Sequence, residues 1–273
     1  MFRIPITFLC LIFLFLNTAC QKEKGCTDPK ALNYNPSAKE SDGNCQYPAA
    51  ISPQPVQLNF HLHQHFGTPE FDTATQYLLP SGVKIQLSQL RFYLSNVRLI
   101  NLDGTEILIP ESWILVKPGI ETFPIGTVTP GKFKGVKFLV GIDSASNSGG
   151  TSPADRPAGH PLGFQSPSMF WSWASGYIFV RMEGSVDTTG TGTPNLSFVC
   201  HVGSNALKRE VQINFTDTLS VSSGAESFVH LKVQLDKLFD NVNLKVNRNT
   251  HTMDNLPLAT QIVNNAATMF SEE

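Results

Sequence analysis

SMFWSWASGYIFVRMEG, at residues 168–184, holds two of the chain's three tryptophans, one residue apart. Its aromatic and β-branched residues favour an extended strand, in which side chains alternate between two faces. The alternation places Trp171 and Trp173 on one face, so their indoles are expected to stand side by side. The plainer alternative is that both indoles fill the core of a sandwich, because most large aromatic side chains serve packing. These residues are called the tryptophan segment below.

Short apolar runs, punctuated by glycine, proline, serine and threonine, continue on both sides of this segment. This pattern of short apolar runs between turn-forming residues is typical of all-β proteins. We expect a helix over residues 256–270, a turn of helix over 236–240, and further strands over 56–65, 87–102, 106–109, 113–116, 133–142, 196–202, 211–215 and 228–235. The sequence therefore predicts an all-β, antiparallel Greek-key sandwich of about eight to ten strands with a short C-terminal helix.

Three of the seven histidines lie on the polar face of the first expected strand. His61, His63 and His65 alternate with apolar residues there, and strand rise spaces neighbours about 7 Å apart. These three residues are called the histidine row. Since imidazole suits copper and zinc, we interpret the row as metal ligands. The alternative is a polar solvent face that happens to be rich in histidine.

Other candidate ligands are more isolated. The polar segment at residues 143–164 is expected to be a loop, and it contains His160, which either covers a metal site near the tryptophans or lies on plain surface. In the strand expected over 196–202, Cys200 faces away from His201, so Cys200 is interpreted as a small buried hydrophobic residue. His230 stands on the polar face of its strand and is interpreted as surface.

Four stretches resemble the sequence pattern of the MbnP-like copper-binding proteins, and they fall in that family's order. WSWASGYIFVRMEG resembles the family's WSW-x-x-GY-x-F-x-x-x-EG signature. Three other family patterns are resembled by LSQLRFYLSNVRL (87–99), FKGVKFLVGIDSASN (133–147) and FVCHVGS (198–204). The similarity covers roughly residues 55 to 240.

The resemblance implies a function. In that family a di-haem partner of the MauG type oxidises a tryptophan to kynurenine, whose amine and ketone help to form a copper site. Carried over to this sequence, it implies Trp171 or Trp173 as the modified residue. The implied ligands are His63, His65 and His201, with His61 and His160 as further candidates. Two imidazoles and a kynurenine make a low-coordinate site of the kind that Cu(I) accepts. The implied role is copper acquisition or homeostasis.

Several function classes are not supported by the sequence. It lacks G-x-S-x-G, H-E-x-x-H, Walker, GxGxxG and C-x-x-C-H motifs, so the protein is expected not to be an enzyme. Charged residues are 15% of the chain, the formal net charge is −2, and no basic run suggests a nucleic-acid partner. The alternative to copper binding is a surface-anchored carbohydrate- or protein-binding sandwich, in which the tryptophans form an exposed stacking platform.

Residues 1–20 have the pattern of a targeting segment. Arg3 precedes an apolar run over residues 8–16, which is too short to span a bilayer comfortably. The run leads into NTAC, so we expect a lipoprotein signal peptide with Cys20 as the lipid anchor, although Asn17 stands where leucine is usual. A cleaved secretory peptide and an uncleaved anchor are the alternatives. The expected location is the cell envelope, as an outer-membrane lipoprotein facing the periplasm or the cell surface.

Residues 21–48 are expected to form a small, turn-rich module clipped by a disulfide between Cys26 and Cys45. Exported proteins keep disulfides oxidised, and closing this loop stabilises the fold by about 3 kcal/mol. The segment resembles a short module attached to bacterial surface proteins. Four of its polar residues either bind calcium or cap turns: Asp28, Asn33, Asn35 and Asp42. Residues 49–55 are expected to be a linker, and residues 56–273 the sandwich domain.

Overall fold

The computed structural model describes residues 22–47, 54–172 and 175–273. The chain divides into two units, Met1–Ser52 and Pro53–Glu273. The expected signal peptide and Cys20 lie outside the described residues. Within the three described ranges, no helix combines the length and apolar character that crossing a bilayer requires.

In the first unit, β1 (Lys24–Gly25) and β2 (Glu40–Ser41) pair in parallel. A disulfide joins Cys26 to Cys45. The side-chain oxygens of the four calcium candidates accept hydrogen bonds from nearby backbone N–H groups, at Lys30, Gln46, Ser37 and Asn44 respectively. The structure therefore uses these oxygens to shape turns.

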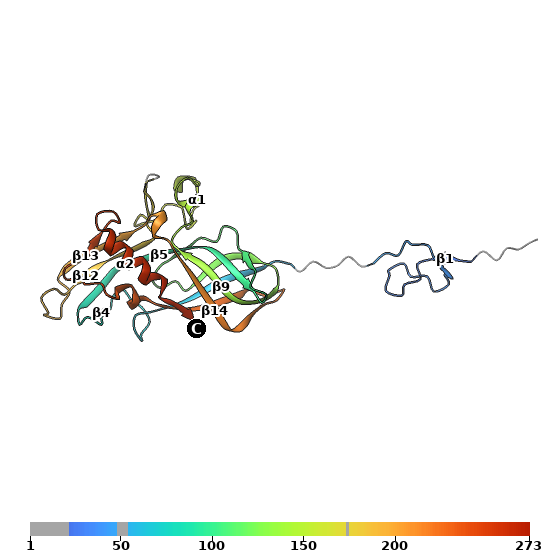
Figure 1. Cartoon of the computed structure of the whole chain (residues 1–273), viewed down its shortest axis with the longest axis horizontal. Helices are drawn as coiled ribbons and strands as arrows, with labels where there is room; N and C mark the ends of the chain where they lie inside the picture. The colour runs from blue at the N-terminus through green and yellow to red at the C-terminus, as the bar shows by residue number, and fades with distance from the viewer. Residues whose placement is uncertain (1–21, 48–53, 173–174) are drawn as a thin grey trace, which may run out of the picture. The chain divides into compact units, whose positions relative to one another are not determined.

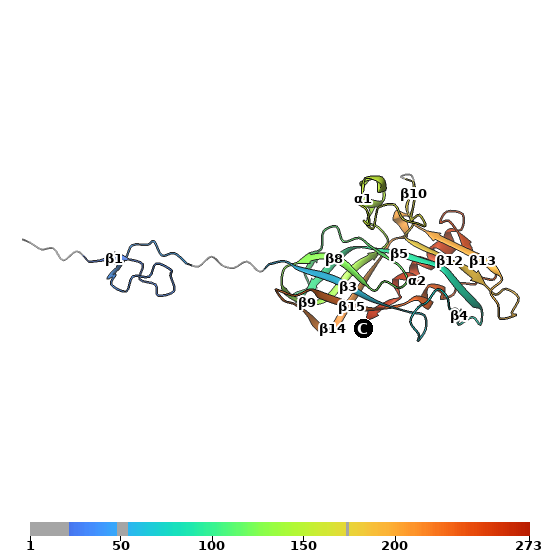
Figure 2. The same ribbon diagram turned by 180° about the vertical axis from the view of Figure 1, so that it is seen from behind.

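The second unit is built from two sheets that pack face to face (Figures 1 and 2). The nine-stranded sheet follows the order β14 (Arg209–Val221), β9 (Gly131–Val140), β5 (Lys84–Asn101), β12 (Val180–Val186), β13 (Leu196–Val202), β16 (Asn249–Thr250). Three short strands also pair with β5, namely β4 (Gln76–Leu78), β6 (Glu106–Leu108) and β7 (Ile114–Val116). The four-stranded sheet follows the order β17 (Phe270–Glu272), β15 (Ser227–Gln234), β3 (Val56–His65), β8 (Thr122–Val128).

The predicted all-β sandwich with a short C-terminal helix is confirmed. Most strand pairs are antiparallel, but β15 runs parallel to β3, and β16 runs parallel to β13. The helix, α2 (Leu256–Ala267), begins after Asn255, whose side chain accepts from the N–H of Leu258. It ends three residues earlier than expected, because the chain turns at Thr268 and then enters β17.

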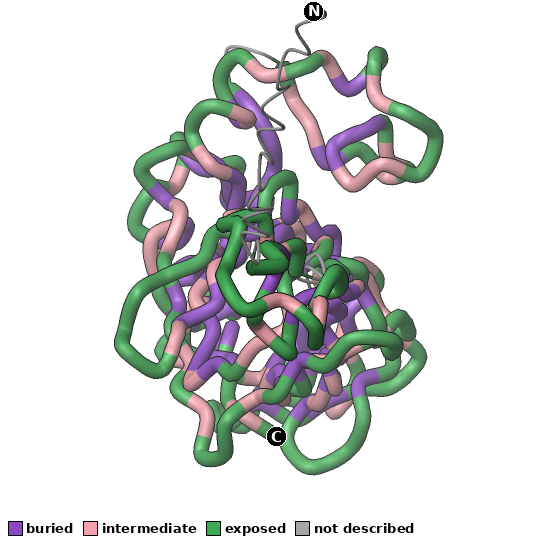
Figure 3. The backbone as a smooth tube through the Cα atoms, turned by 90° about the vertical axis from the view of Figure 1, so that its right-hand side faces the viewer, coloured by how far each residue is buried: buried purple, intermediate pink, exposed green. Residues whose placement is uncertain are grey.

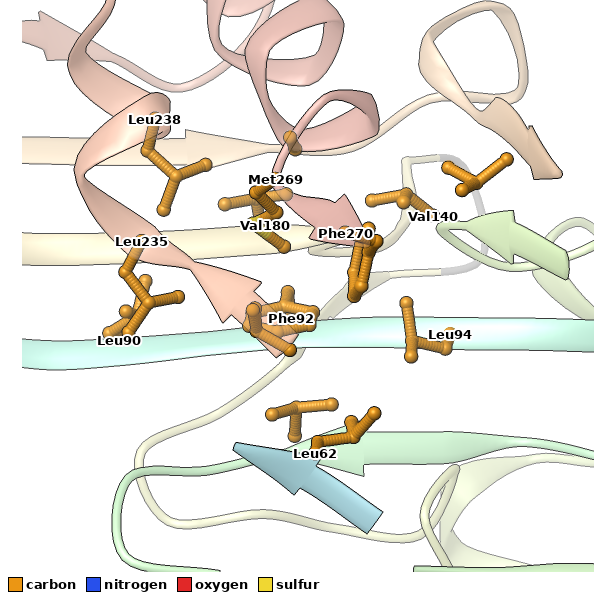
Figure 4. Close-up of a cluster of buried hydrophobic side chains, with 14 of the residues drawn as sticks. Leu62, Leu90, Phe92, Leu94, Val140, Val180, Leu235, Leu238, Met269 and Phe270 are labelled. Carbon is orange, nitrogen blue, oxygen red and sulfur yellow. The ribbon is translucent and has the colours of Figure 1, made fainter. Parts of the chain in front are cut away.

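Apolar side chains from both sheets fill one core. Phe60 of β3 meets Phe138 of β9 edge to face, with ring centroids 5.6 Å apart. Figure 4 shows Phe92 of β5 and Phe270 of β17 in the same core, with Leu235 from the 3-10 helix η3 (Leu235–Phe239). Figure 3 colours the backbone by burial, and its buried segments lie mostly inside while exposed segments form the outer loops. Because the inner faces pack this way, the polar alternate residues of each sheet point outward.

The tryptophan segment does not form the single strand that was expected. It is divided into β10 (Phe170–Ser172), β11 (Gly176–Tyr177) and β12. β10 and β11 pair with each other as a small hairpin. Gly176 has a φ of +78°, which favours glycine, and a Cβ there would lie 2.4 Å from the side-chain oxygen of Asn147. The prediction of one continuous strand is therefore wrong. The prediction that the two indoles stand side by side depends on Trp173, which lies outside the described residues.

Candidate metal centres

The hairpin of the tryptophan segment is anchored on the outer face of the nine-stranded sheet. Tyr93 of β5 and Tyr177 of β11 meet edge to face, with ring centroids 5.7 Å apart. Both belong to a second hydrophobic cluster, separate from the main core, against which Trp171 packs. The Tyr93 hydroxyl donates to the carbonyl of Pro161, and the Tyr177 hydroxyl donates to that of Leu162. These contacts fix the position of the hairpin and therefore of Trp171.

A cleft of about 400 Å³ opens beside this hairpin. Its lining comes from three separate stretches: Trp171, Ser175, Gly203, Ser204, His251, Thr252 and Met253. These residues define the tryptophan cleft. Gly203 lies so close to the hairpin that a Cβ on it would be 3.1 Å from Cζ3 of Trp171 and 2.1 Å from the carbonyl oxygen of Tyr177. The absence of a side chain at Gly203 thus lets the indole approach β13.

Two histidines meet at the tryptophan cleft. The rings of His201 and His251 lie edge to face, with centroids 5.1 Å apart. Nε2 of His201 is 2.7 Å from a carboxylate oxygen of Glu183, which also contacts Arg181. When Nε2–H donates to Glu183, Nδ1 of His201 keeps its lone pair for a metal. His251 is oriented in turn through Nδ1, which is 3.2 Å from a carboxylate oxygen of Asp254.

The environment of His201 favours the neutral ring. Burial lowers the pKa of His201 below its ordinary value, and this outweighs the opposing effect of the Glu183 carboxylate. The nearby Arg181 guanidinium lowers the pKa further. Because metals bind the unprotonated imidazole, His201 is available as a ligand near neutral pH.

The donor set of the tryptophan cleft fits copper. The imidazole of His251 lines the cleft and contacts that of His201, and Met253 adds a thioether at the rim, where it is 76% exposed. The indole of Trp171 offers an N–H donor but no lone pair in ligating geometry. Imidazole and thioether are donors that suit a low-coordinate Cu(I) ion.

The histidine row forms a separate group on the four-stranded sheet. Ligand atoms of His61, His63 and Glu121 all lie within 4.8 Å of one another. Across residues 22–47, 54–172 and 175–273, this is the group of histidine, cysteine and acidic side chains that meets the geometry of a metal site. His230 on β15 joins it, with its ring centroid 5.1 Å from that of His61. His65 is turned away to the loop that follows, where Nδ1 lies 3.2 Å from the carbonyl oxygen of Thr68.

The ligands expected to share one copper ion are thus divided between two sheets. His63 and His65 point outward from β3 in the four-stranded sheet, whereas His201 points outward from β13 in the nine-stranded sheet. Because the two sheets pack through their inner faces, these outward side chains lie on opposite sides of the sandwich. The structure therefore places His201 against His251, which lines the same cleft as Trp171, and it places His63 with His61 and His230.

His160 belongs to neither group. Its Nδ1 accepts from the N–H of Leu162, and its ring centroid is 5.6 Å from that of Trp113. Burial and the nearby Arg156 lower the pKa of His160. Trp113 is half-buried, and its Nε1–H donates to Asp143. His160 therefore packs within the loop instead of covering the tryptophan cleft.

Three residues at these sites were not predicted from the sequence as ligands: His251, His230 and Glu121. His251 lies beside His201 because β16 pairs in parallel with β13. His230 lies opposite His61 because β15 pairs in parallel with β3. Neither parallel pairing has a local sequence signal, since the paired strands are far apart in the chain. For His251 and His230, the sequence signal was the presence of further histidines outside the histidine row.

The family model MbnP matches residues 54–254. Among solved structures, MbnP from Methylosinus trichosporium matches with a TM-score of 0.47 and 17% sequence identity, over 71% of this chain and 80% of that chain. The comparison with curated proteins finds no match.

Proposed function

Because the chain belongs to the MbnP family, we propose that it is a copper-binding protein of the cell envelope whose copper site lies in the tryptophan cleft. Trp171, His201 and His251 are the proposed centre. One observation carries the proposal: Trp171 lines the same cleft as His251, whose ring contacts that of His201. A tryptophan and an imidazole from distant stretches thus line one cleft, and a second imidazole contacts the first.

The proposed centre needs a modified tryptophan. Oxidation breaks the indole C2–C3 bond and adds two oxygen atoms, which gives N-formylkynurenine. Hydrolysis then releases the C2 carbon as formate and leaves kynurenine, with an aromatic amine beside a ketone. The oxidising equivalents would come from a MauG-type di-haem partner, since this chain carries no C-x-x-C-H haem attachment motif. Trp171 is half-buried at an open cleft, so a partner docked there could oxidise it by electron transfer without inserting a haem edge. Trp173 stays the alternative target.

The surrounding residues support copper in defined ways. Glu183 and Asp254 hold the two imidazoles from behind, as carboxylates commonly do for metal-bound histidine. The exposed thioether of Met253 at the rim is a soft donor that suits Cu(I) during entry or release. The proposed role is copper acquisition or homeostasis, with the protein held at the membrane through lipid on Cys20.

The alternative function, a carbohydrate- or protein-binding module, has weaker support. A stacking platform needs a flat, exposed aromatic face. Trp171 is instead half-buried and packs against the second hydrophobic cluster.

The test is a Cu(I) titration of protein produced together with the di-haem partner. His61→Gln and His63→Gln are included in every sample, so that the histidine row cannot contribute. In this background, His201→Gln or His251→Gln should each weaken Cu(I) binding about tenfold or more. His160→Gln is the matched control and should leave binding unchanged. Equal affinity in all samples would contradict the proposed centre.

A further inference from the structure

We propose that His61, His63 and His230, with Glu121, form a second metal site for a divalent transition metal such as Zn(II) or Cu(II). It lies on the outer face of the four-stranded sheet. This site does not depend on the tryptophan cleft or on any modification of Trp171. It would therefore bind metal in protein that has never met an oxidising partner.

Three neighbouring strands bring the ligands together. His61 and His63 lie on β3, two residues apart and both pointing outward. In the parallel register, His230 of β15 is the direct partner of His61. On the opposite side, Thr122 at the start of β8 pairs with His61, and Glu121 precedes it. The sheet itself thus sets the positions of all four side chains.

The spacing of the rings matches the spacing that a shared metal requires. Metal–nitrogen bonds of about 2.0–2.1 Å in a tetrahedral site place neighbouring imidazole centroids about 5 Å apart. The observed centroid separations are 4.4 Å for His61 and His63, 5.1 Å for His61 and His230, and 6.4 Å for His63 and His230. Small side-chain rotations would therefore bring three nitrogens onto one ion.

The hydrogen bonds that orient the rings of His61 and His63 use Nδ1 and not Nε2. Nδ1 of His61 is 3.0 Å from the hydroxyl of Thr122, and Nδ1 of His63 contacts the carboxylate of Glu273. A carboxylate or hydroxyl on one ring nitrogen fixes the ring and makes the other nitrogen a better ligand. Nε2 of His61 then lies 3.6 Å from a carboxylate oxygen of Glu121, where a metal could bridge the two.

The donor set selects the class of metal. Three imidazoles and one carboxylate suit Zn(II) and Cu(II), whereas Ca(II) and Mg(II) prefer oxygen ligands throughout. Lys232 lies opposite His63 on β15 and opposes cation binding there. The carboxylates of Glu121 and Glu273 both contact the row and offset that charge. The rival explanation is a set of surface histidine–glutamate ion pairs that bind no metal.

The experiment uses protein produced without the di-haem partner, so that Trp171 and Trp173 are intact. Zn(II) is titrated against a competing chelator, and Cu(II) is then added for electron paramagnetic resonance. We expect one tight equivalent of metal and nitrogen hyperfine structure from imidazoles. His61→Gln and His63→Gln should each weaken Zn(II) binding about tenfold or more, and His230→Gln should also weaken it.

His65→Gln is the matched control, because His65 lies on the same strand face but is turned to Thr68. It should leave affinity and spectrum unchanged. Circular dichroism checks that each surface variant keeps the fold. The proposal is overturned if the unmodified protein binds no metal tightly, or if His65→Gln weakens binding as much as His61→Gln does. Neither result would bear on copper in the tryptophan cleft, which is measured in the modified protein.

Discussion

The ring of His251 packs edge to face against the ring of His201, with the two planes at 89°. The parallel pairing of Cys200 on β13 with Thr250 on β16 places these two histidines beside each other. Trp171 reaches the same place from the hairpin above β5. Because this surface site is built from three distant stretches, changes in the backbone that brings them together should affect both stability and metal binding.

Gly203→Ala should damage both stability and copper binding. The new Cβ would lie 2.1 Å from the Tyr177 carbonyl oxygen, and a backbone atom cannot yield as a flexible side chain does. We expect a loss of about 1–3 kcal/mol in the free energy of unfolding, measured by urea denaturation. Gly131→Ala is the control, since its Cβ would meet its nearest neighbour, a ring carbon of Phe133, at 3.4 Å. Equal stability of the two variants would contradict the close approach.

Phe60→Ala should be among the most costly core changes. Phe60 is fully buried and joins the two sheets through its contact with Phe138. Removing the ring leaves a cavity, so we expect a loss of about 3–5 kcal/mol in the free energy of unfolding. Phe164, which is 74% exposed, provides the comparison. Phe164→Ala should change stability by about 0.5 kcal/mol at most, and a similar loss in both variants would argue against the described core.

Cys200 should be unreactive in the folded protein. Its side chain is buried in the main core, and burial raises the pKa of the thiol to about 12. The thiolate, which is the reactive form, is therefore scarce at pH 8. Labelling with a thiol reagent at pH 8 should be negligible in native protein and rapid in denaturant. Rapid labelling of the native protein would show that Cys200 is accessible.

Asp187 should make the fold sensitive to acid. Burial alone would raise the pKa of Asp187, but hydrogen bonds from the backbone N–H of Gly192 and from Thr189 and Gly190 lower it below its ordinary value. The unfolded chain then binds a proton more readily than the folded chain. The stabilisation is present above the unfolded pKa of about 3.9, and it is lost as pH falls through the lower folded value.

Asp187→Asn should accordingly reduce the melting temperature at pH 7. Between pH 4 and pH 2, the range in which the Asp187 carboxylate becomes protonated, the melting temperature of the variant should fall less than that of the wild type. Thermal unfolding across that pH range is the measurement. The exposed Asp217 on β14 supplies the control, Asp217→Asn. If both variants follow the wild-type acid curve, the Asp187 hydrogen bonds do not stabilise the fold as described.

Regular alternation allowed parts of the fold to be predicted from the sequence. The strand of the histidine row begins at Val56 and ends at His65, as its alternating apolar residues indicate. The single strand predicted for the tryptophan segment was wrong, because its strand-forming side chains are interrupted by a hairpin that includes Gly176. Strand β8 was not predicted, since its proline and glycine weaken the pattern over Thr122–Val128.

The sites were predictable only in part. The spacing of His61 and His63 indicated a metal site, and the two do lie together. The resemblance pointed to Trp171 and His201, and it grouped His201 with histidines that lie on the other sheet, because sequence does not reveal which sheet each strand enters. The contributions of His230 and His251 depend on two parallel pairings between distant strands, which arise from tertiary packing.

The proposed copper centre requires that Trp171 is converted to a copper ligand beside His201 and His251. The most direct test is the mass of the peptide that carries Trp171 and Trp173, from protein purified out of its own host with the di-haem partner present. We predict that Trp171 has gained one oxygen atom and lost one carbon atom, as fragmentation of the peptide would show. Two intact tryptophans in cells that express the partner would contradict it.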